Sequence, residues 1–327
     1  MRKTVLKILM LFCLASPALI GQVGEITRDT SFTPRSAFQK ERLRFPFIEM
    51  VRENPPPGVR EHRGLVYRSI GFRELRLDLF QPADRAEKPF PAVLLVHGGG
   101  WRSGDKSHLV PMAQQLAQRG YVAASVAYRL SPEARYPAAV TDLKAALRWL
   151  RAHAEDFRID TARIAILGCS SGAQLATLVG FTPGMAKFEE GENPDYPSTV
   201  QAVVNIDGVV DFTSDYVRGF EDDPRKNPSA AGAWFGGRFI EKEALWREAS
   251  PLQYAGSGSP PILFVNSSNP RFHAGRDELL ARLAAEGIYG EVYTFPDTPH
   301  PFWLFHPWFS ETVDRVGRFL DKVLENK

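Results

Sequence analysis

Short apolar runs alternate with longer amphipathic stretches along most of this chain. The apolar runs are typical of strands that are buried on both faces. They lie at residues 93–96, 121–126, 162–167, 202–206, 262–265 and 291–295. Apolar positions with helical spacing lie between several of them, at residues 110–119, 138–153 and 173–179. The alternation predicts an α/β fold with a mainly parallel sheet covered by helices on both faces, preceded by antiparallel strands at residues 64–68 and 74–79.

The two ends of the pattern differ from its middle. Residues 1–21 join a basic start to an apolar run too short to span a membrane comfortably, which predicts a secretory signal peptide cleaved near Gly21. We therefore expect a secreted or periplasmic protein with no membrane span in its mature form. Residues 22–60 are rich in Arg, Phe and Pro and are expected to wrap the domain as an extended arm, while residues 61–327 form the main domain.

Basic and acidic residues are nearly balanced in this chain. The chain has 40 basic and 38 acidic residues, a formal net charge of +2, and loss of Arg2, Lys3 and Lys7 with the signal peptide would leave 37 basic against 38 acidic. This near balance argues against a nucleic-acid partner or a polybasic membrane contact. The mature chain would keep only Cys169, so we expect no intramolecular disulfide and a small buried thiol. The sequence says nothing about oligomeric state.

A Gly-x-Ser-x-Gly pentapeptide, Gly168–Gly172, stands between the strand at 162–167 and the helix at 173–179. This strand–turn–helix setting is typical of a nucleophile elbow, in which a strained turn lifts the serine hydroxyl into a site. The two glycines are needed because a Cβ there would collide with the neighbouring strand or helix. We therefore predict Ser170 as a catalytic nucleophile.

A glycine-rich loop, His97-Gly98-Gly99-Gly100-Trp101, follows the strand at 93–96. Consecutive glycines can turn backbone N–H groups toward a reacting carbonyl without interference from side chains. We predict that the N–H groups of Gly99, Gly100 and Ser171 form an oxyanion hole. His97 is expected to order this loop.

A histidine follows the last predicted strand, within Pro296-Asp297-Thr298-Pro299-His300. A histidine in this place can return to a serine far away in the chain and act as its general base. We predict His300 in that role, and His306 is the main alternative.

With these three motifs, the chain resembles the α/β-hydrolase superfamily and, within it, the bacterial secreted carbohydrate-esterase group that includes acetylesterase-, feruloyl- and pectin-esterase-like proteins. The resemblance runs from about Val66 to the C-terminus. It also includes Trp101–Lys106, which looks like the family's continuation of the glycine loop, and the segment from Tyr128 to Leu150. It implies an α/β-hydrolase fold in which the long insertion around residues 181–254 is a cap over the active site.

The triad acid departs from the family pattern. The resemblance places this carboxylate after the penultimate strand, at 262–265, but Asn269 stands there, and an asparagine cannot stabilise an imidazolium in the same way. Asp277 is the nearest carboxylate, and we predict it as the acid. The alternatives are Asp207 and Asp211, which follow the strand at 202–206, and Asp297, which is close to His300 in sequence.

Two clusters bear on the substrate. Trp303 belongs to an aromatic group beside His300 that either stacks on sugars or packs the last helix, and Trp101 belongs to the glycine loop. Arg271, His273 and Arg276 crowd the loop after 262–265, where guanidinium groups could bind a uronic acid, face solvent or pair with Asp277. These five residues are the predicted substrate contacts: Trp101, Arg271, His273, Arg276 and Trp303.

Together these features predict a serine carboxylic-ester hydrolase that removes acetyl, methyl or feruloyl esters from a plant-type polysaccharide such as pectin. No metal or organic cofactor is expected, because the chain has neither a zinc-type His/Cys spacing nor a phosphate loop. A serine peptidase on the same fold is one alternative. The other is a non-catalytic binding protein, which the absent carboxylate near Asn269 suggests.

Overall fold

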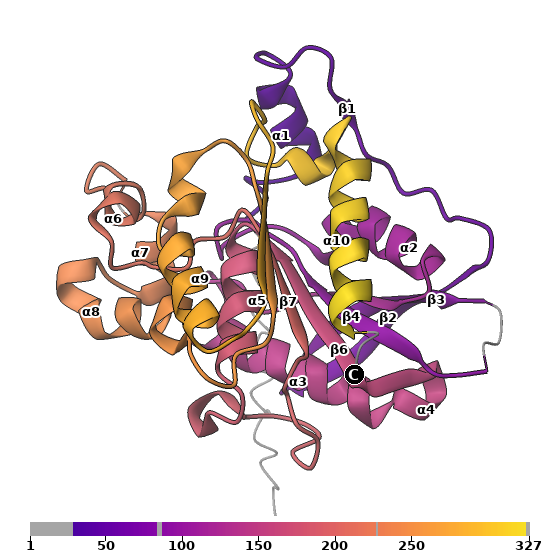
Figure 1. The fold of residues 1–327 in the computed structure, drawn as a ribbon. Helices are drawn as coiled ribbons and strands as arrows, with labels where there is room; N and C mark the ends of the chain where they lie inside the picture. Colours follow the sequence, from indigo (N-terminus) through magenta and orange to yellow (C-terminus); the bar gives the residue numbers. More distant parts are fainter. Residues whose placement is uncertain (1–28, 84–86, 227, 325–327) are drawn as a thin grey trace, which may run out of the picture.

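The computed structural model describes residues 29–83, 87–226 and 228–324, so the predicted signal peptide lies outside the described residues. The chain folds around a central mixed sheet with helices on both sides (Figure 1). The strands are Glu49–Met50 (β1), Val59–Ile70 (β2), Arg73–Pro82 (β3), Phe90–Val96 (β4), Val122–Val126 (β5), Ile159–Cys169 (β6), Ala202–Ile206 (β7), Ile262–Asn266 (β8), Gly290–Thr294 (β9) and Phe305–His306 (β10).

Within the described residues the main sheet has eight strands, in the order β2-β3-β5-β4-β6-β7-β8-β9. The first two form an antiparallel hairpin, β3 is antiparallel to β5, and the strands from β5 to β9 in this order are parallel. The predicted fold is thus confirmed, antiparallel start included. Because parallel neighbours end at the same edge, the loops that follow β4, β6, β7 and β9 can meet there.

Helices cover both faces of the sheet, as expected for a parallel sheet. The helices are Pro34–Glu41 (α1), Val110–Gln118 (α2), Ala138–Ala152 (α3), Ala154–Phe157 (α4), Ser171–Phe181 (α5), Asp215–Glu221 (α6), Ala230–Phe235 (α7), Phe239–Glu248 (α8), Arg276–Ala285 (α9) and Trp308–Leu324 (α10). Short 3-10 turns cover Lys106–Leu109, Ala186–Phe188, Pro251–Tyr254, Pro270–His273 and Phe302–Leu304.

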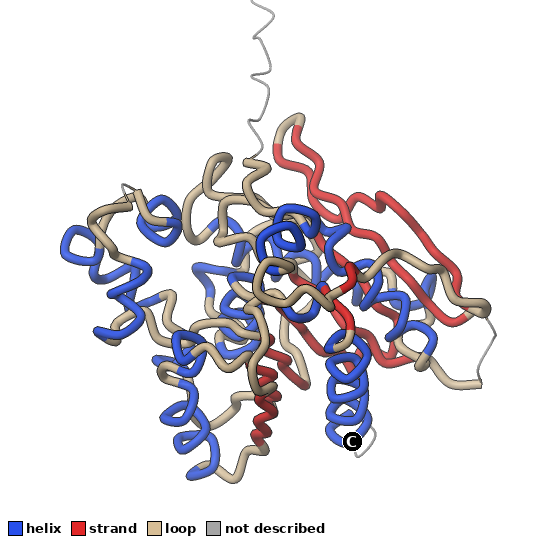
Figure 2. Tube along the Cα trace, turned by 90° about the horizontal axis from the view of Figure 1, so that it is seen from above, coloured by secondary structure: helices blue, strands red, loops and turns tan. Residues whose placement is uncertain are grey.

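Two apolar cores follow from the alternation of side chains along each strand. On β6, Ile164 and Ile166 face the core that includes α3, α5 and α9, whereas Ala165 and Leu167 face the core that includes α2 and α10. Figure 2 shows the strands crossing the molecule between helices. None of the helices in the described ranges combines the length and the apolar character that a membrane crossing requires.

The N-terminal arm is only partly extended. Thr33 caps α1 by accepting the N–H of Ser36, and β1 then pairs antiparallel with β10 in a small separate sheet. The arm thus lies against the C-terminal tail, and Phe45 packs edge-on against Trp308 with ring centroids 5.7 Å apart. Local hydrogen bonding at a capping residue explains why this segment begins a helix where the sequence suggested an extended arm.

The insertion around residues 181–254 contains β7 and the helices α6, α7 and α8. These helices lie together to one side of the sheet, at the left in Figure 1. Their inner surface is aromatic, and Trp234 of α7 stacks on Trp101 of the glycine loop at 5.1 Å. The helical part of the insertion therefore packs directly against one of the sequence motifs.

Candidate active site

Ser170 occupies a strained turn between β6 and α5. Its backbone has φ 56° and ψ −124°, a conformation that non-glycine residues rarely adopt. A Cβ on Gly168 would lie 2.0 Å from the carbonyl oxygen of Gly172, and a Cβ on Gly172 would lie 2.2 Å from that of Val96. The structure thus gives a steric reason for both glycines of the pentapeptide.

His300 lies between Ser170 and a carboxylate. Its Nε2 is 2.8 Å from Ser170 Oγ, and its Nδ1 is 2.9 Å from Asp207 Oδ2. With Nδ1–H donating to the carboxylate, Nε2 is free to accept the serine proton. The structure therefore brings the predicted nucleophile and base together. His306, the alternative base, pairs with Glu49 in the small sheet instead.

Asp207 is the acid partner, and the prediction of Asp277 is wrong. Asp207 directly follows β7 and is fully buried, with φ 54°; its Oδ1 accepts the Ser267 N–H at 2.8 Å and the Asn266 amide at 3.2 Å. Asp277 stands in the first turn of α9, where its side chain is 78% exposed and pairs with Arg276. The Asp277 carboxylate therefore faces solvent beside Arg276 and does not contact His300.

The other candidate acids have separate local roles. Asp211 accepts the backbone N–H and the hydroxyl of Thr213, and Asn269 caps a 3-10 turn by accepting the Arg271 N–H. Asp297 is mostly exposed and pairs with Arg44 of the arm. Each is explained by local structure, and none contacts His300.

The glycine loop lies beside Ser170, and its backbone requires glycine. Gly99 has φ 136° and Gly100 has φ 61°, and a Cβ on Gly99 would lie 2.1 Å from the Ser103 carbonyl oxygen. The Gly99 carbonyl accepts the Ser103 N–H and hydroxyl, at 3.0 and 2.8 Å. Among the described residues, no protein acceptor takes the N–H of Gly99, Gly100 or Ser171. These three groups remain our predicted oxyanion hole.

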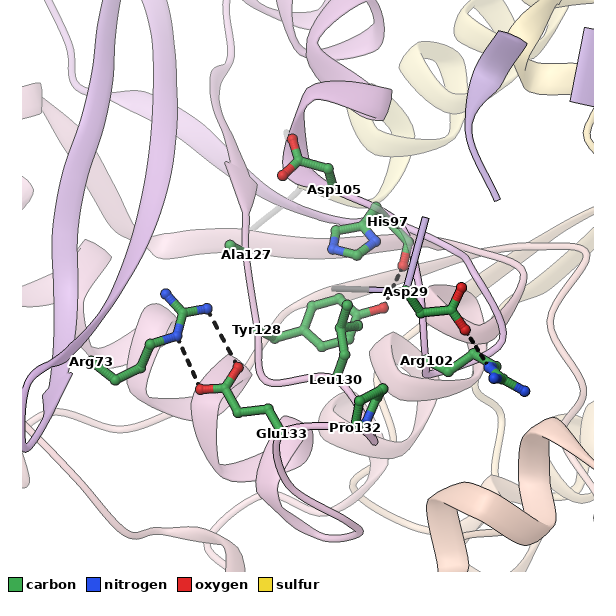
Figure 3. A pocket seen from close by; sticks show the side chains of 11 residues that line it. Asp29, Arg73, His97, Arg102, Asp105, Ala127, Tyr128, Leu130, Pro132 and Glu133 are labelled. Atoms are coloured by element: carbon green, nitrogen blue, oxygen red, sulfur yellow. Dashed lines mark hydrogen bonds and ion pairs between the residues drawn. The ribbon is translucent and has the colours of Figure 1, made fainter. Parts of the chain in front are cut away.

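His97 supports this loop from the adjoining small cavity that Figure 3 shows. Its Nδ1 donates to the Gly98 carbonyl at 2.9 Å, and its ring stacks on Tyr128 at 4.5 Å. The Tyr128 hydroxyl in turn donates to the His97 carbonyl at 2.8 Å. Burial lowers the pKa of His97 to about 4, so the ring is neutral at pH 7. In the same view Arg102 pairs with Asp29 of the arm.

The cavity in front of Ser170 is small and mixed in character. Two of the five predicted substrate contacts, Trp101 and Arg271, line it. Trp101 is held in place by its indole N–H, which donates to Gln174 at 2.9 Å. The lining residues are Gly100, Trp101, Ser170, Ser171, Val209, Glu221, Ala230, Arg271 and Phe272.

The other three predicted substrate contacts are absent from this lining. His273 contacts the Ser267 carbonyl through Nε2 at 2.8 Å, and Arg276 is held by Asn266 and Asp277. Trp303 is buried and packs edge-on against the His300 ring at 5.2 Å. The packing alternative thus holds for Trp303, because the tryptophan lies against the base from within the protein core.

Glu221 and Phe272 line the cavity but were not predicted from the sequence. Glu221 is buried and pairs with the guanidinium of Arg271, and Phe272 stacks on the imidazole of His300 with centroids 4.0 Å apart. The only sequence signal was the position of Phe272 in the loop after β8. Cys169, by contrast, is buried as predicted, and burial raises the pKa of its thiol well above the ordinary value.

Comparison with known proteins agrees with this geometry. The BD-FAE family model matches residues 77–272, well over half of the chain, including the elbow and Asp207. Esterase LipC of Mycobacterium tuberculosis is 30% identical over 236 residues, 66% of this chain and 55% of LipC. Probable carboxylic ester hydrolase LipM of the same organism is 37% identical over 250 residues, 71% of this chain and 54% of LipM. The chain thus spans about half the length of these curated relatives.

Solved structures share the fold. Butyrate-bound Est2, an esterase from Thermogutta terrifontis, superposes with a TM-score of 0.67 at 24% identity, over 82% of this chain and 95% of Est2. A truncated carbohydrate esterase from gut microbiota gives 0.66 at 22% identity, over 83% of this chain and 100% of its own. Together with the serine elbow and the family match, these likenesses show that the chain belongs to the BD-FAE family and has the α/β-hydrolase fold.

Proposed function

We propose that this protein is a secreted serine carboxylic-ester hydrolase that removes short acyl groups from a plant-type polysaccharide such as pectin. The observation that carries the proposal is the unbroken contact from Ser170 through His300 to Asp207. A nucleophile, an orienting carboxylate and a base between them are the parts that acyl transfer requires.

The first half of the reaction forms an acyl-enzyme. Ser170 Oγ attacks the ester carbonyl carbon while His300 Nε2 takes its proton. The carbonyl oxygen becomes an oxyanion that the N–H groups of Gly99, Gly100 and Ser171 stabilise by hydrogen bonding. The carbon–oxygen bond to the alcohol then breaks, and His300 gives the proton to the departing alkoxide.

The second half releases the acid. Water attacks the acyl-enzyme as His300 takes a proton from it, and the collapse of the second oxyanion returns that proton to Ser170 Oγ. Asp207 keeps His300 in the tautomer that can accept these protons and stabilises the positive charge on the ring. With a buried carboxylate in this place, the binding-protein alternative loses the observation that motivated it.

The cavity favours the acetyl group among the three candidate esters. The narrow cavity that Trp101 and Phe272 line beside Ser170 suits a short acyl chain better than a feruloyl ring with its substituents. The carbohydrate part is supported by the sequence resemblance and by a fold relative that is described as a carbohydrate esterase. Secretion is supported by the pattern of residues 1–21.

The test is product release from esterified pectin and xylan by the wild type and by Ser170→Ala. We expect acetate from the wild type only, with little methanol or ferulate. Methanol or ferulate as the main product would move the proposal to that ester. Folded wild-type protein that releases none of the three, while cleaving an amide substrate, would overturn the proposal in favour of a peptidase.

A further inference from the structure

Helix α6 carries two exposed aromatic rings on one face. Tyr216 and Phe220 are four residues apart and therefore adjacent on the helix, with ring centroids 5.4 Å apart in an edge-to-face arrangement. Their exposed fractions are 48% and 40%. We call this pair the aromatic platform.

The platform is not needed to anchor its helix. Val217 of α6 is fully buried in the core, and the guanidinium of Arg218 lies 4.5 Å from the centroid of the Phe239 ring. Ser214 caps the helix by accepting the Val217 N–H. Since these contacts hold α6 in place, exposure of two large rings on its outer face is unexplained by packing.

Arg271 connects the platform to the catalytic cavity. Its guanidinium carbon lies 5.6 Å from the centroid of Phe220 and 5.2 Å from that of Phe272. Arg271 also lines the cavity with Ser170, and its side chain is 29% exposed. The Arg271 guanidinium thus lies between the Phe220 ring at the surface and the Phe272 ring against His300.

Glu221 fixes the guanidinium in this position. It follows Phe220 in the chain but faces inward, where its buried carboxylate pairs with Arg271. A bond to a buried partner restricts a long side chain far more than a bond at the surface does. The exposed part of Arg271 is therefore a rigid edge between platform and cavity.

We propose that the aromatic platform and the exposed edge of Arg271 form a subsite for a sugar ring in the alcohol part of the substrate. The proposal rests on the function proposed above, in which the cavity takes the acyl group. The apolar C–H face of a pyranose ring packs on aromatic rings as other apolar surface does, and its hydroxyl or carboxylate oxygens can accept N–H groups of Arg271. The platform would thus recognise the polysaccharide next to the ester bond.

The test compares two substrates on the same variants. For Tyr216→Ala/Phe220→Ala we expect kcat/KM on an acetylated oligosaccharide to fall roughly tenfold, mainly through KM, and kcat/KM on p-nitrophenyl acetate to stay within about twofold. Phe72→Ala is the matched control, because Phe72 is 93% exposed in the turn between β2 and β3, remote from the insertion in sequence. It should leave both substrates unchanged.

The outcomes separate the two proposals. If wild type releases acetate from the oligosaccharide and the double variant does so equally well, the platform proposal is wrong and the proposed function stands. Equal losses on both substrates would also contradict it, since a sugar subsite acts only on the sugar. If wild type cleaves p-nitrophenyl acetate but no oligosaccharide, the polysaccharide substrate itself is wrong. Acetylated xylan and galacturonan fragments, tested side by side, show whether the subsite beside Arg271 favours a sugar with hydroxyl groups alone or one with a carboxylate.

Discussion

The ring of Phe272 lies flat against the imidazole of His300, with centroids 4.0 Å apart and planes 10° from parallel. Trp303 contacts the same imidazole edge-on at 5.2 Å. The two rings leave His300 little room to rotate, so its nitrogens stay aligned with Ser170 and Asp207. The position of the His300 ring is therefore fixed by packing as well as by hydrogen bonds.

Phe272→Leu should lower kcat about tenfold with a smaller change in KM. Leucine keeps most of the apolar volume but loses the flat surface, and a base that rotates spends less time within reach of the serine proton. Steady-state kinetics on p-nitrophenyl acetate measures this. Phe295→Leu is the control, because Phe295 is also buried but packs on Phe302 and Tyr293. Equal kcat for both variants would contradict the positioning role.

Asp207→Asn should lower kcat on p-nitrophenyl acetate by roughly 10³- to 10⁴-fold, while Asp277→Asn should change it less than about twofold. The amide at position 207 can neither stabilise the imidazolium nor enforce the same tautomer. Asp277, by contrast, is exposed and pairs with Arg276. A loss of activity in Asp277→Asn comparable to that in Asp207→Asn would restore the assignment made from sequence.

Much of this site was predictable because its chemistry depends on local patterns. The elbow and the glycine loop require glycine wherever a Cβ would meet backbone. These glycines lie close together in the sequence and therefore form recognisable motifs. Gly172 is an example, since any side chain there meets the ends of β4. The strands were equally visible, because burial on both faces produces uninterrupted apolar runs.

The acid and the cavity walls depend on contacts that sequence does not record. Asp207 and Asp277 both follow an expected strand, and only the three-dimensional path shows which carboxylate reaches His300. The pair of Glu221 and Arg271 joins an insertion helix to the loop after β8, 50 residues apart in the chain. The same holds for the pairing of β1 with β10, which the sequence of the arm alone did not suggest.

Ser170→Gly should be more stable than Ser170→Ala by about 1 kcal/mol, although both lack the nucleophile. Only glycine adopts φ 56° and ψ −124° without steric strain, and that relief exceeds the entropy that glycine loses on folding. Urea unfolding of the two variants at one pH measures the difference. Equal midpoints with equal slopes would mean that the elbow stores no strain.

Acid should destabilise the protein partly through His97. Its pKa is about 4 in the folded protein against an ordinary value of 6.5, so the unfolded chain binds a proton in this window that the folded chain does not. Stability therefore falls as pH drops from about 6.5 toward 4. Between pH 7 and 5 the wild type should lose about 2 kcal/mol more than His97→Asn in urea unfolding. Parallel losses in the two proteins would remove His97 as the cause.

Because Asp207 stands at the end of β7, the triad acid and part of the cavity wall come from two different loops. The turn after β8 contributes Arg271 and Phe272 to the cavity but no member of the proton-transfer chain. A change at Arg271 can therefore reshape the entrance while every atom that handles a proton keeps its support. Such a division favours evolvability, and a library randomised at position 271 should yield altered substrate preference from clones that remain active.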